Sequence, residues 1–277
     1  MILADCHVHS SFSSDSKAPM EHMIEKALEL GLKRLCFTDH MDYDYPSVNE
    51  SSFVFDLEEY RNRLLKLKEH YEKHIEIFTG IELGLQPQLA GRLYKLTDSS
   101  PFDYIIGSSH VVDHVDPYYP EYWTDKSKEE GIKRYFESIL ENCRAFMGFH
   151  VYGHLDYIVR YVPERLYDAG QPGGKADYSC SDYSDLIDKI LKLLICSGKG
   201  IEINTAGLKY GLGYPHPKKE ILKRYKELGG ELITIGSDAH KPEHLCYDFQ
   251  LLPEYLKHLG FKYYAVFING SPVYEKL

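Results

Sequence analysis

The sequence predicts an α/β fold in which seven or eight βα units close into a barrel similar to the TIM barrel. Apolar runs of strand length alternate with longer helical patterns along most of the chain. Several runs are continuously apolar, as in parallel strands that helices cover. The 277 residues suit one barrel-sized domain, 1–277. A doubly wound open sheet is the alternative, but no glycine-rich dinucleotide fingerprint follows the first strand.

Eight segments have the length and the apolar character of strands, with polar residues at one or both ends. They are Ile2–His9, Arg34–His40, Ile75–Gly84, Phe102–His110, Gly148–His154, Gly200–Thr205, Glu231–Asp238 and Tyr263–Ile268. In the first of them the two histidines alternate with Cys6 and Val8, which predicts that His7 and His9 leave the same face of the strand.

Six helices are predicted between the strands from apolar residues at helical spacing. They are Pro19–Leu30, Asp56–His74, Ser127–Met147, Tyr183–Cys196, Pro217–Leu228 and Pro242–Leu259. Pro19 suits a first helical turn and Gly31 a helix end, and Asp56 is a capping residue. Most of the other helices also end at or near glycine.

Three long connections follow predicted strands and are polar and rich in tyrosine: Met41–Phe55, Val111–Lys126 and Tyr161–Ser181. In a barrel, the loops that follow the strands lie together over the face where substrates bind. We therefore expect these three connections to surround a functional site.

Composition excludes several classes of partner. The chain has 32 basic and 42 acidic residues, a formal net charge of −10, and no basic stripe of the kind that binds nucleic acid. No apolar stretch approaches the roughly 18–20 residues that span a bilayer, and the N-terminus does not have the pattern of a signal peptide. The six cysteines are scattered without a C-x-x-C pair, which is typical of reduced thiols. We expect a cytoplasmic protein that binds neither nucleic acid nor membranes.

Acidic and imidazole side chains recur where the predicted strands end. His7 and His9 close the first strand, and the same types of residue close or follow the others: Asp15, Asp39, His40, Glu82, His110, His154, Asp238 and His240. Each one alone is explained as a helix cap or a hydrogen-bonded core residue. Together they favour a metal cluster, because bound cations offset the cost of burying carboxylates and imidazoles.

The motifs that contain these residues are DCHVHSSFSSDS, FTDH, TGIELG, IIGSSH, YGHLDY, IEINTAG and ITIGSDAH. In this order they resemble the polymerase-and-histidinol-phosphatase (PHP) superfamily, and within it the monofunctional histidinol-phosphate phosphatases. The resemblance implies a distorted (βα)₇ barrel that binds three divalent metal ions. It assigns His7, His9, Glu82 and Asp238 to the first ion. Glu82 would bridge to a second ion, held also by His110 and His154, and the third would be held by Asp15, His40 and His240.

Such a ligand set contains nitrogen and oxygen but no sulfur, which suits Zn²⁺, Mn²⁺ or Fe²⁺. The resemblance implies a metal-dependent phosphomonoesterase that hydrolyses L-histidinol phosphate to L-histidinol and phosphate in histidine biosynthesis. Our mechanistic hypothesis is in-line attack by a hydroxide that bridges the metals, without a covalent phosphoenzyme. The candidate catalytic residues are Glu82, Asp238 and His240. Either Asp238 or a metal-bound water would protonate the leaving alkoxide.

Basic residues in two of the predicted strand-end loops are candidates for binding the substrate phosphate. They are Arg160, whose guanidinium matches two phosphoryl oxygens, and Lys209. For the ammonium and imidazole of histidinol phosphate, the candidates are three acids and five aromatic residues: Asp42, Asp44, Glu50, Tyr43, Tyr45, Tyr118, Tyr119 and Trp123. His114 and His150 are interpreted as structural, and the remaining histidines as solvated: His22, His70, His74, His216, His244 and His258.

Three other functions fit parts of the pattern. A PHP phosphoesterase acting on a nucleotide phosphodiester, a nucleic acid or phosphotyrosine would have the same site, but the acidic balance disfavours a polymeric substrate. A non-catalytic metal-binding accessory module is disfavoured by the complete set of ligand positions. A metal-dependent amidohydrolase would need a strand-end lysine to bridge its metals, and none fits.

Overall fold

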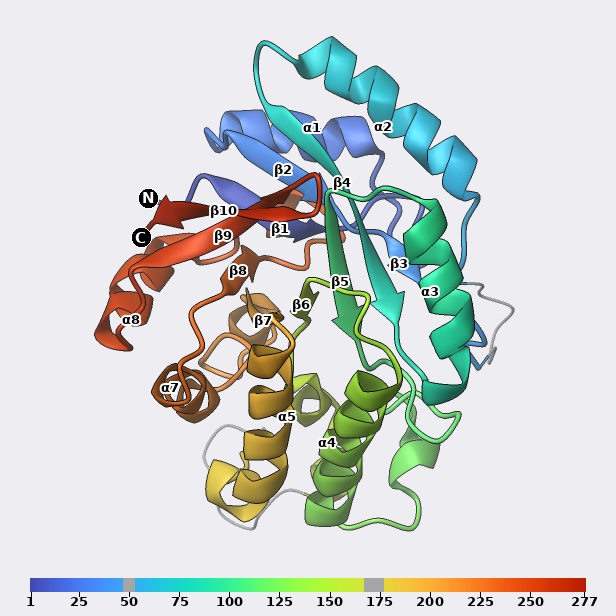
Figure 1. Ribbon diagram of the computed structural model, residues 1–277, viewed down its shortest axis with the longest axis vertical. Coiled ribbons are helices and arrows are strands. Elements are labelled where there is room, and N and C mark those ends of the chain that lie inside the picture. The colour runs from blue at the N-terminus through green and yellow to red at the C-terminus, as the bar shows by residue number, and fades with distance from the viewer. Residues whose placement is uncertain (47–52, 167–176) are drawn as a thin grey trace.

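The computed structural model describes residues 1–46, 53–166 and 177–277. Seven parallel strands form a nearly closed barrel and are hydrogen-bonded in the order β1-β2-β4-β5-β6-β7-β8 (Figure 1). Their bounds are β1 Ala4–Val8, β2 Arg34–Phe37, β4 Glu76–Gly84, β5 Tyr104–Ser108, β6 Val151–Tyr152, β7 Gly200–Asn204 and β8 Ile233–Gly236. A short strand, β3 His40–Met41, pairs with β4 beyond the end of β2. The prediction of a distorted α/β barrel is confirmed.

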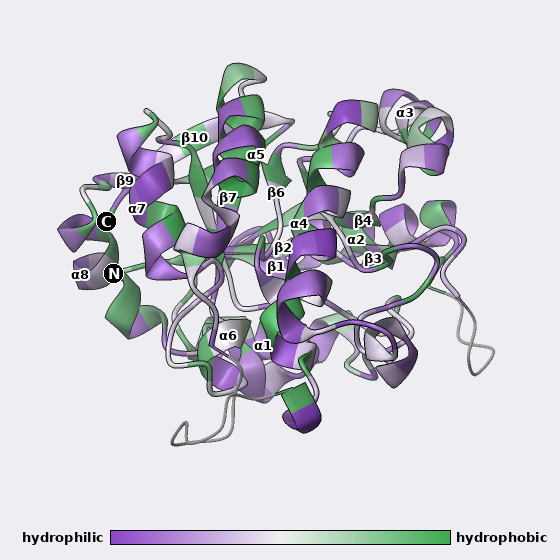
Figure 2. Ribbon diagram, turned by 90° about the horizontal axis from the view of Figure 1, so that it is seen from below, coloured by the Kyte–Doolittle hydropathy of each residue, from purple (hydrophilic) through white to green (hydrophobic). Residues whose placement is uncertain are grey.

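Helices surround the barrel, and each of the longer ones buries one apolar side. Their bounds are α1 Met20–Glu29, α2 Leu57–Tyr71, α3 Ala90–Ser99, α4 Lys128–Ala145, α5 Ser184–Cys196, α6 Ala206–Lys209, α7 Lys219–Glu227 and α8 Leu252–His258. In α5, for example, Ile187, Ile190 and Leu194 are buried at helical spacing. Figure 2 shows hydrophilic and hydrophobic residues on the same helices, as expected for helices that cover a core. None of the helices in the described residues is long and apolar enough to cross a bilayer.

The seam of the barrel lies between β1 and β8, which share a single isolated parallel bridge, between Val8 and Ala239. A buried carboxylate strengthens this seam. Asp5 accepts hydrogen bonds from the backbone N–H and the hydroxyl of Ser237, at 3.0 and 2.5 Å, and from the N–H of Cys246 at 3.0 Å. Asp5 therefore fixes the chain beside Asp238 against the first strand.

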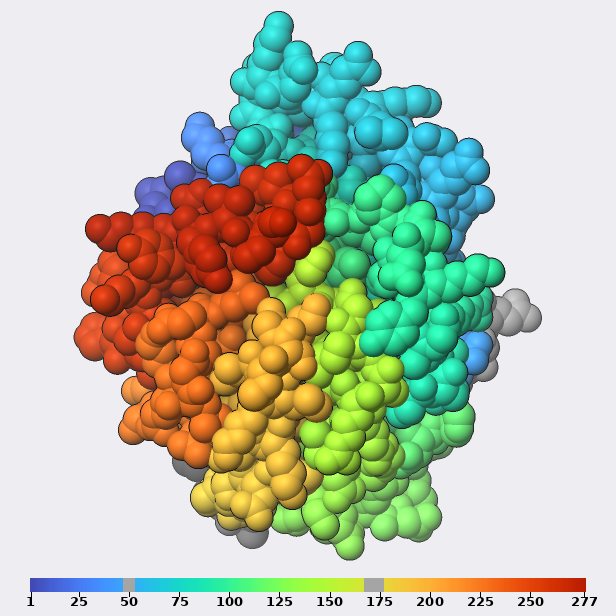
Figure 3. Space-filling model, in the orientation of Figure 1, coloured from blue at the N-terminus to red at the C-terminus, as the bar shows by residue number. Residues whose placement is uncertain are grey.

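Two predicted elements differ in the structure. The last predicted strand, β9 Tyr263–Ile268, lies outside the barrel and forms an antiparallel hairpin with β10 Ser271–Lys276, which covers part of the face seen in Figure 3. The predicted helix Pro242–Leu259 is wrong over most of its length, because only α8 at its end is α-helical. Cys246 and Asp248 interrupt it with positive φ angles of 54° each. Helix α3 was not predicted.

Candidate metal centre

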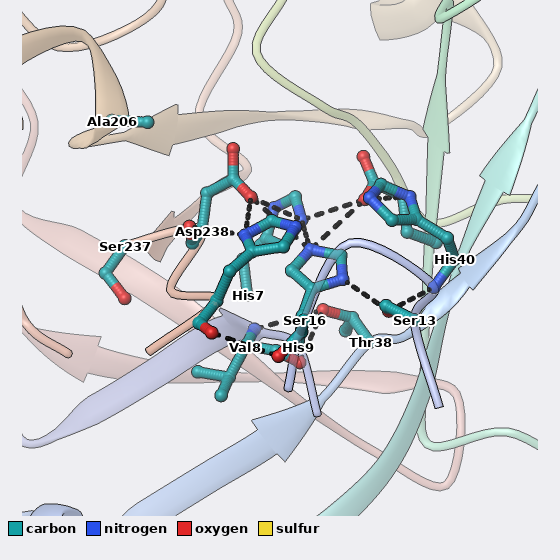
Figure 4. A network of polar contacts seen from close by, with 12 residues as sticks. His7, Val8, His9, Ser13, Ser16, Thr38, His40, Ala206, Ser237 and Asp238 are labelled. Atoms are coloured by element: carbon teal, nitrogen blue, oxygen red, sulfur yellow. Dashed lines mark hydrogen bonds and ion pairs between the residues drawn. The ribbon is translucent and has the colours of Figure 1, made fainter. Parts of the chain in front are cut away.

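The predicted ligand residues converge at the carboxyl ends of the parallel strands. His7 lies on β1 and His9 just after it, His40 lies on β3 and Glu82 near the end of β4. His110, His154, Asp238 and His240 follow β5, β6 and β8, and Asp15 lies in the loop after β1. Figure 4 shows the rings of His7, His9 and His40 and the carboxylate of Asp238 directed toward one another. Parallel strands bring their carboxyl ends to one face, so residues far apart in sequence meet there.

Glu82 is the centre of one half of this cluster, and its side chain is only 1% exposed. Its Oε2 lies 3.1 Å from His7 Nε2 and 3.4 Å from His9 Nε2. Its Oε1 lies 2.9 Å from His154 Nε2 and 3.2 Å from His110 Nε2. His40 Nδ1 also lies 3.1 Å from Oε2. The two oxygens of one carboxylate thus face two different sets of imidazoles, an arrangement suited to a carboxylate that bridges two ions.

The second half of the cluster is formed by residues from loops and from β3. Oδ1 of Asp238 lies 3.3 Å from His9 Nε2 and 3.5 Å from His240 Nδ1. Oδ2 of Asp15 lies 3.1 Å from His240 Nε2 and 3.6 Å from His40 Nε2. His9 and His240 stack with ring centroids 4.0 Å apart.

Among the described residues, four groups of three place one potential ligand atom each within 4.8 Å of the others. They are His7, His9 and Glu82; Glu82, His110 and His154; His9, His40 and His240; and His40, Asp42 and His110. The first two match the sets expected for the first and second ions, without Asp238. The third contains His40 and His240 of the set expected for the third ion, with His9 in place of Asp15. Asp15 and Asp238 lie next to these groups at the distances given above.

The contacts within the cluster fit a metal better than they fit hydrogen bonds. The Nε2 atoms of His7 and His9 lie 3.0 Å apart, a separation that one shared proton or one bound cation accounts for. His40 Nδ1 and His240 Nε2 are buried without a hydrogen-bond partner, even though each lies 3.1 Å from a carboxylate oxygen. Groups that are close together but not aimed at each other are expected where they share a cation.

The electrostatics of the cluster favour ionised carboxylates. Burial alone would raise the pKa of Glu82, but His7, His40 and His110 outweigh it and hold this pKa well below its usual range. The pKa of Asp238 is also well below its usual range, because His7 and His9 outweigh its burial. For His40, burial lowers the pKa but Glu82 and Asp15 raise it, to about 9 in all. The carboxylates therefore attract positive charge into the site.

Further polar groups hold the ligand side chains from behind. The Ser108 hydroxyl donates to Glu82 Oε1 at 2.7 Å, and Ser13 Oγ lies 3.0 Å from His9 Nδ1. Asp42 Oδ2 lies 2.6 Å from His110 Nδ1. These contacts fix the ring orientation of His9 and His110 and leave their Nε2 atoms directed into the cluster.

Both predicted basic residues lie beside the cluster. The Lys209 ammonium donates to the carbonyl of Asp238 at 3.0 Å. The Arg160 guanidinium lies 3.8 Å from the centroid of the Tyr210 ring and also faces Tyr161. Burial would lower the pKa of Arg160, but Tyr161 and Asp238 outweigh it and raise this pKa. Lys209 therefore contacts the backbone of Asp238, and Arg160 lies near enough to Asp238 for their charges to interact.

Several other sequence predictions are corrected. Asp42 does not face open space for a substrate ammonium; it is 3% exposed because it pairs with His110. Trp123 is fully buried, and its indole donates to the carbonyl of Pro117, so it cannot cover a substrate imidazole. His216 is not solvated but fully buried, with Nδ1 2.5 Å from Asp156 Oδ1. Glu50 lies outside the described residues.

The remaining substrate candidates have mixed surroundings. Asp44 faces Arg92 at the surface, with 3.8 Å between the charged atoms, and Tyr43 lies under the same guanidinium. The Tyr45 hydroxyl donates to Asp116. Tyr118 is 62% exposed and packs edge to face with the Tyr119 and Tyr161 rings.

His150 is structural, as predicted, because it stacks on Phe267 and accepts the N–H of Ile105.

Sequence reasoning missed Glu202, which is 1% exposed and contacts two residues of the cluster. Its Oε1 lies 2.5 Å from His7 Nδ1, and its Oε2 accepts the N–H of His154 at 2.9 Å. The signal was an acidic residue inside the otherwise apolar run GIEIN of the strand β7. A buried acid in the middle of a strand needs a partner, and here the partner is a residue of the site.

Comparisons with known proteins show the family to which the chain belongs. Residues 5–206 match the family model of the PHP domain. The chain is 30% identical to a histidinol-phosphatase of Lactococcus lactis, over 95% of this chain and 93% of that protein. It is 33% identical to a probable histidinol-phosphatase of Thermotoga maritima, over 95% of each chain.

A solved structure is also similar. It is the crystal structure of the histidinol phosphate phosphatase of Lactococcus lactis in complex with zinc, L-histidinol and phosphate. It superposes with a TM-score of 0.84 at 27% identity, over 98% of each chain. The chain therefore belongs to the PHP domain family and, within it, to the histidinol-phosphatases.

Proposed function

We propose that this protein is a metal-dependent phosphatase that hydrolyses L-histidinol phosphate to L-histidinol and phosphate, a reaction of histidine biosynthesis. The observation that carries the proposal is the arrangement of Glu82, one of whose oxygens faces His7, His9 and His40 while the other faces His110 and His154. The similarity of the whole chain to a histidinol phosphate phosphatase solved with zinc, L-histidinol and phosphate supports the choice of substrate.

The nine residues expected as ligands would hold three divalent ions. His7, His9, Glu82 and Asp238 would bind the first; Glu82, His110 and His154 the second; and Asp15, His40 and His240 the third. We propose zinc as the resident metal, because the donors are imidazole and carboxylate and the related structure contains zinc. Mn²⁺ and Fe²⁺ suit the same donors.

When bound, such ions lower the pKa of water and neutralise charge on the phosphoryl oxygens. The residues of the chain then have separate tasks. Glu82, Asp238 and His240 hold the site in the geometry needed for in-line displacement. Arg160 would bind two phosphoryl oxygens, and Lys209 would hold the backbone of Asp238 and add positive charge. The proton for the leaving alkoxide would come through Asp238, which faces His9 and His240, or from a water at the metal site.

We further propose that residues 1–277 act as one PHP-type unit in the cytoplasm. All six cysteines are free, and three of them are buried in the core, as expected for a protein kept under reducing conditions. The expected partner is a small phosphomonoester, because an acidic protein repels a polymeric phosphate backbone.

The test is an assay of the purified protein, loaded in turn with Zn²⁺, Mn²⁺ and Fe²⁺, against a panel of phosphomonoesters and one phosphodiester. The rate of phosphate release measures hydrolysis of each compound. We expect kcat/KM for L-histidinol phosphate to exceed that for every other compound in the panel. Preference for the phosphodiester, or no release from L-histidinol phosphate with any of the metals, would refute the proposal. Arg160→Met should lower kcat/KM by about 10- to 100-fold, the loss expected for hydrogen bonds to a charged group.

A further inference from the structure

We infer that Glu202 is a positioning residue that orients two metal ligands at once, the side chain of His7 and the backbone of His154. The inference rests on the proposed metal centre and adds to it a residue outside the nine expected ligands. Glu202 lies on β7, between the strands that precede His154 and Asp238. Its place in the barrel lets one carboxylate reach both sides of the cluster.

The contacts of Glu202 use both oxygens. Oε1 lies 2.5 Å from His7 Nδ1, on the side of the ring away from Nε2, which faces Glu82 at 3.1 Å. Oε2 accepts the N–H of His154 at 2.9 Å and the side-chain amide of Asn204 at 3.1 Å. His154 has a φ of 20°, a sparsely populated backbone conformation that is kept only when its surroundings enforce it. The hydrogen bond from its N–H to Glu202 is part of that enforcement.

The neighbouring backbone leaves room for the contact between His7 and Glu202. Gly236 ends β8 beside it, and a Cβ atom at this position would lie 2.3 Å from His7 Cβ and 2.6 Å from Glu202 Oε1. No side chain fits there without moving one of the two residues. Steric crowding therefore explains why the ITIGSDAH motif has a glycine at position 236.

The charge of Glu202 also decides which tautomer of His7 is present. A carboxylate can only accept, so it favours the tautomer of His7 with the proton on Nδ1. Nε2 then has a free lone pair for a metal ion. A glutamine at this position can direct its NH₂ group toward His7, which favours the proton on Nε2 and blocks the ligand atom. If the glutamine side chain is turned the other way, its NH₂ group faces two other donors, the backbone N–H of His154 and the side-chain amide of Asn204.

The experiment compares zinc binding by the full-length protein and Glu202→Gln, titrated in competition with a chromogenic chelator and without substrate. We expect zinc affinity to fall by about 10- to 100-fold, the range for partners of metal-bound histidines. In ¹⁵N NMR spectra recorded at a zinc concentration that saturates the wild type but not the variant, the His7 proton should be on Nδ1 in the wild type and on Nε2 in Glu202→Gln.

Two control variants separate positioning from general destabilisation. Thr234 pairs with Glu202 in the β7–β8 register and donates to or accepts from the Tyr104 hydroxyl at 2.7 Å, so Thr234→Val removes a nearby buried hydrogen bond without touching a ligand. We expect Thr234→Val to lower the melting temperature but to bind zinc as the wild type does. Asp42→Asn changes the contact with His110 Nδ1 and lies 3.9 Å from His40 Nδ1, so it should weaken zinc binding at those two histidines and leave the proton of His7 on Nδ1.

Wild-type zinc affinity in Glu202→Gln, or an equal loss of affinity in Thr234→Val, would overturn the inference. An unchanged His7 tautomer would also overturn it. These outcomes are independent of the substrate assay. A wild-type protein that binds zinc but does not hydrolyse L-histidinol phosphate would refute the proposed function and leave the role of Glu202 standing.

Discussion

The two halves of the metal centre differ in how they are built. The half around Glu82 is carried by strands or by residues directly after them, and His7, His9 and Glu82 are at most 1% exposed. The half around Asp15 and His240 is carried by loops, and these two side chains are 41% and 22% exposed. A strand fixes a ligand through the barrel itself, whereas a loop fixes it through a few local contacts.

Each half also has a different set of supporting groups. In the strand half, Glu202, Ser108 and Asp42 hold the far side of His7, Glu82 and His110 at 2.5–2.7 Å. In the loop half, the hydroxyl of Ser16 holds only the backbone of His240, at 3.0 Å. The comparison teaches that the strand half is preorganised and that the loop half has more freedom to adjust to a bound phosphate. Variants in the strand half should therefore have the larger effects.

The largest effect is expected for Glu82→Ala, because this change removes the carboxylate common to two ligand groups. We expect kcat/KM to fall by about 10³-fold or more and at least one zinc ion to be lost, with the barrel still folded by circular dichroism. The matched control is Glu76→Ala at the exposed start of the same strand. Retained activity in Glu82→Ala would remove Glu82 from the bridging role.

Gly236→Ala tests the close packing of the strand half. Because a Cβ atom would collide with His7, the seam between β1 and β8 must shift, and we expect unfolding free energy to fall by about 1–3 kcal/mol. Zinc affinity should fall with it. Gly91→Ala is the control, since a Cβ atom there meets nothing within 4 Å and α3 should gain about 0.5–1 kcal/mol. Equal stability of the two variants in urea titrations would contradict the steric argument.

Asp15→Asn tests the loop half. This side chain is partly exposed, so water can take the place of one ligand atom, and the loss of kcat/KM should stay at about 10- to 100-fold. Zinc titration should show one weakened site and leave the others unchanged. A loss as large as that of Glu82→Ala would show that the two halves do not differ in the way their burial indicates.

The smallest effects are expected for two serine variants, one in each half. Ser108→Ala removes the hydrogen bond to the Glu82 carboxylate and should lower kcat/KM by about tenfold, the low end of the loss expected for one hydrogen bond to a charged group. Ser16→Ala removes a bond to the backbone carbonyl of His240 and should change kcat/KM still less. The two variants are compared by measuring kcat/KM at the same zinc concentration. A larger loss in Ser16→Ala than in Ser108→Ala would contradict the proposed difference between the two halves.

Much of this protein follows from its sequence alone. Alternating strand and helix patterns were sufficient for the parallel barrel, because each apolar run must be buried and each connection must return to the start of the next strand. The sequence also indicated that acidic and imidazole residues at the strand ends meet at one site, because such residues are costly to bury without a cation. That nine of them are metal ligands was implied by the resemblance and stays a prediction. The interruption of Pro242–Leu259 could not be predicted, since it depends on contacts with distant residues such as Asp5. The β9–β10 hairpin, in contrast, has a local signal that the prediction missed: its turn is Asn269-Gly270, with positive φ at both residues.

Only the tertiary structure decided which side chains support the ligands. Asp42 looked like a loop acid, Glu202 like an acid within a strand and His216 like a solvated histidine, yet all three are buried in specific pairs. Their partners lie 68, 195 and 60 residues away in the chain. Local sequence specifies the chemistry that each residue can perform. The closure of the barrel specifies which groups are brought within hydrogen-bonding distance, and therefore which carboxylate contacts which imidazole.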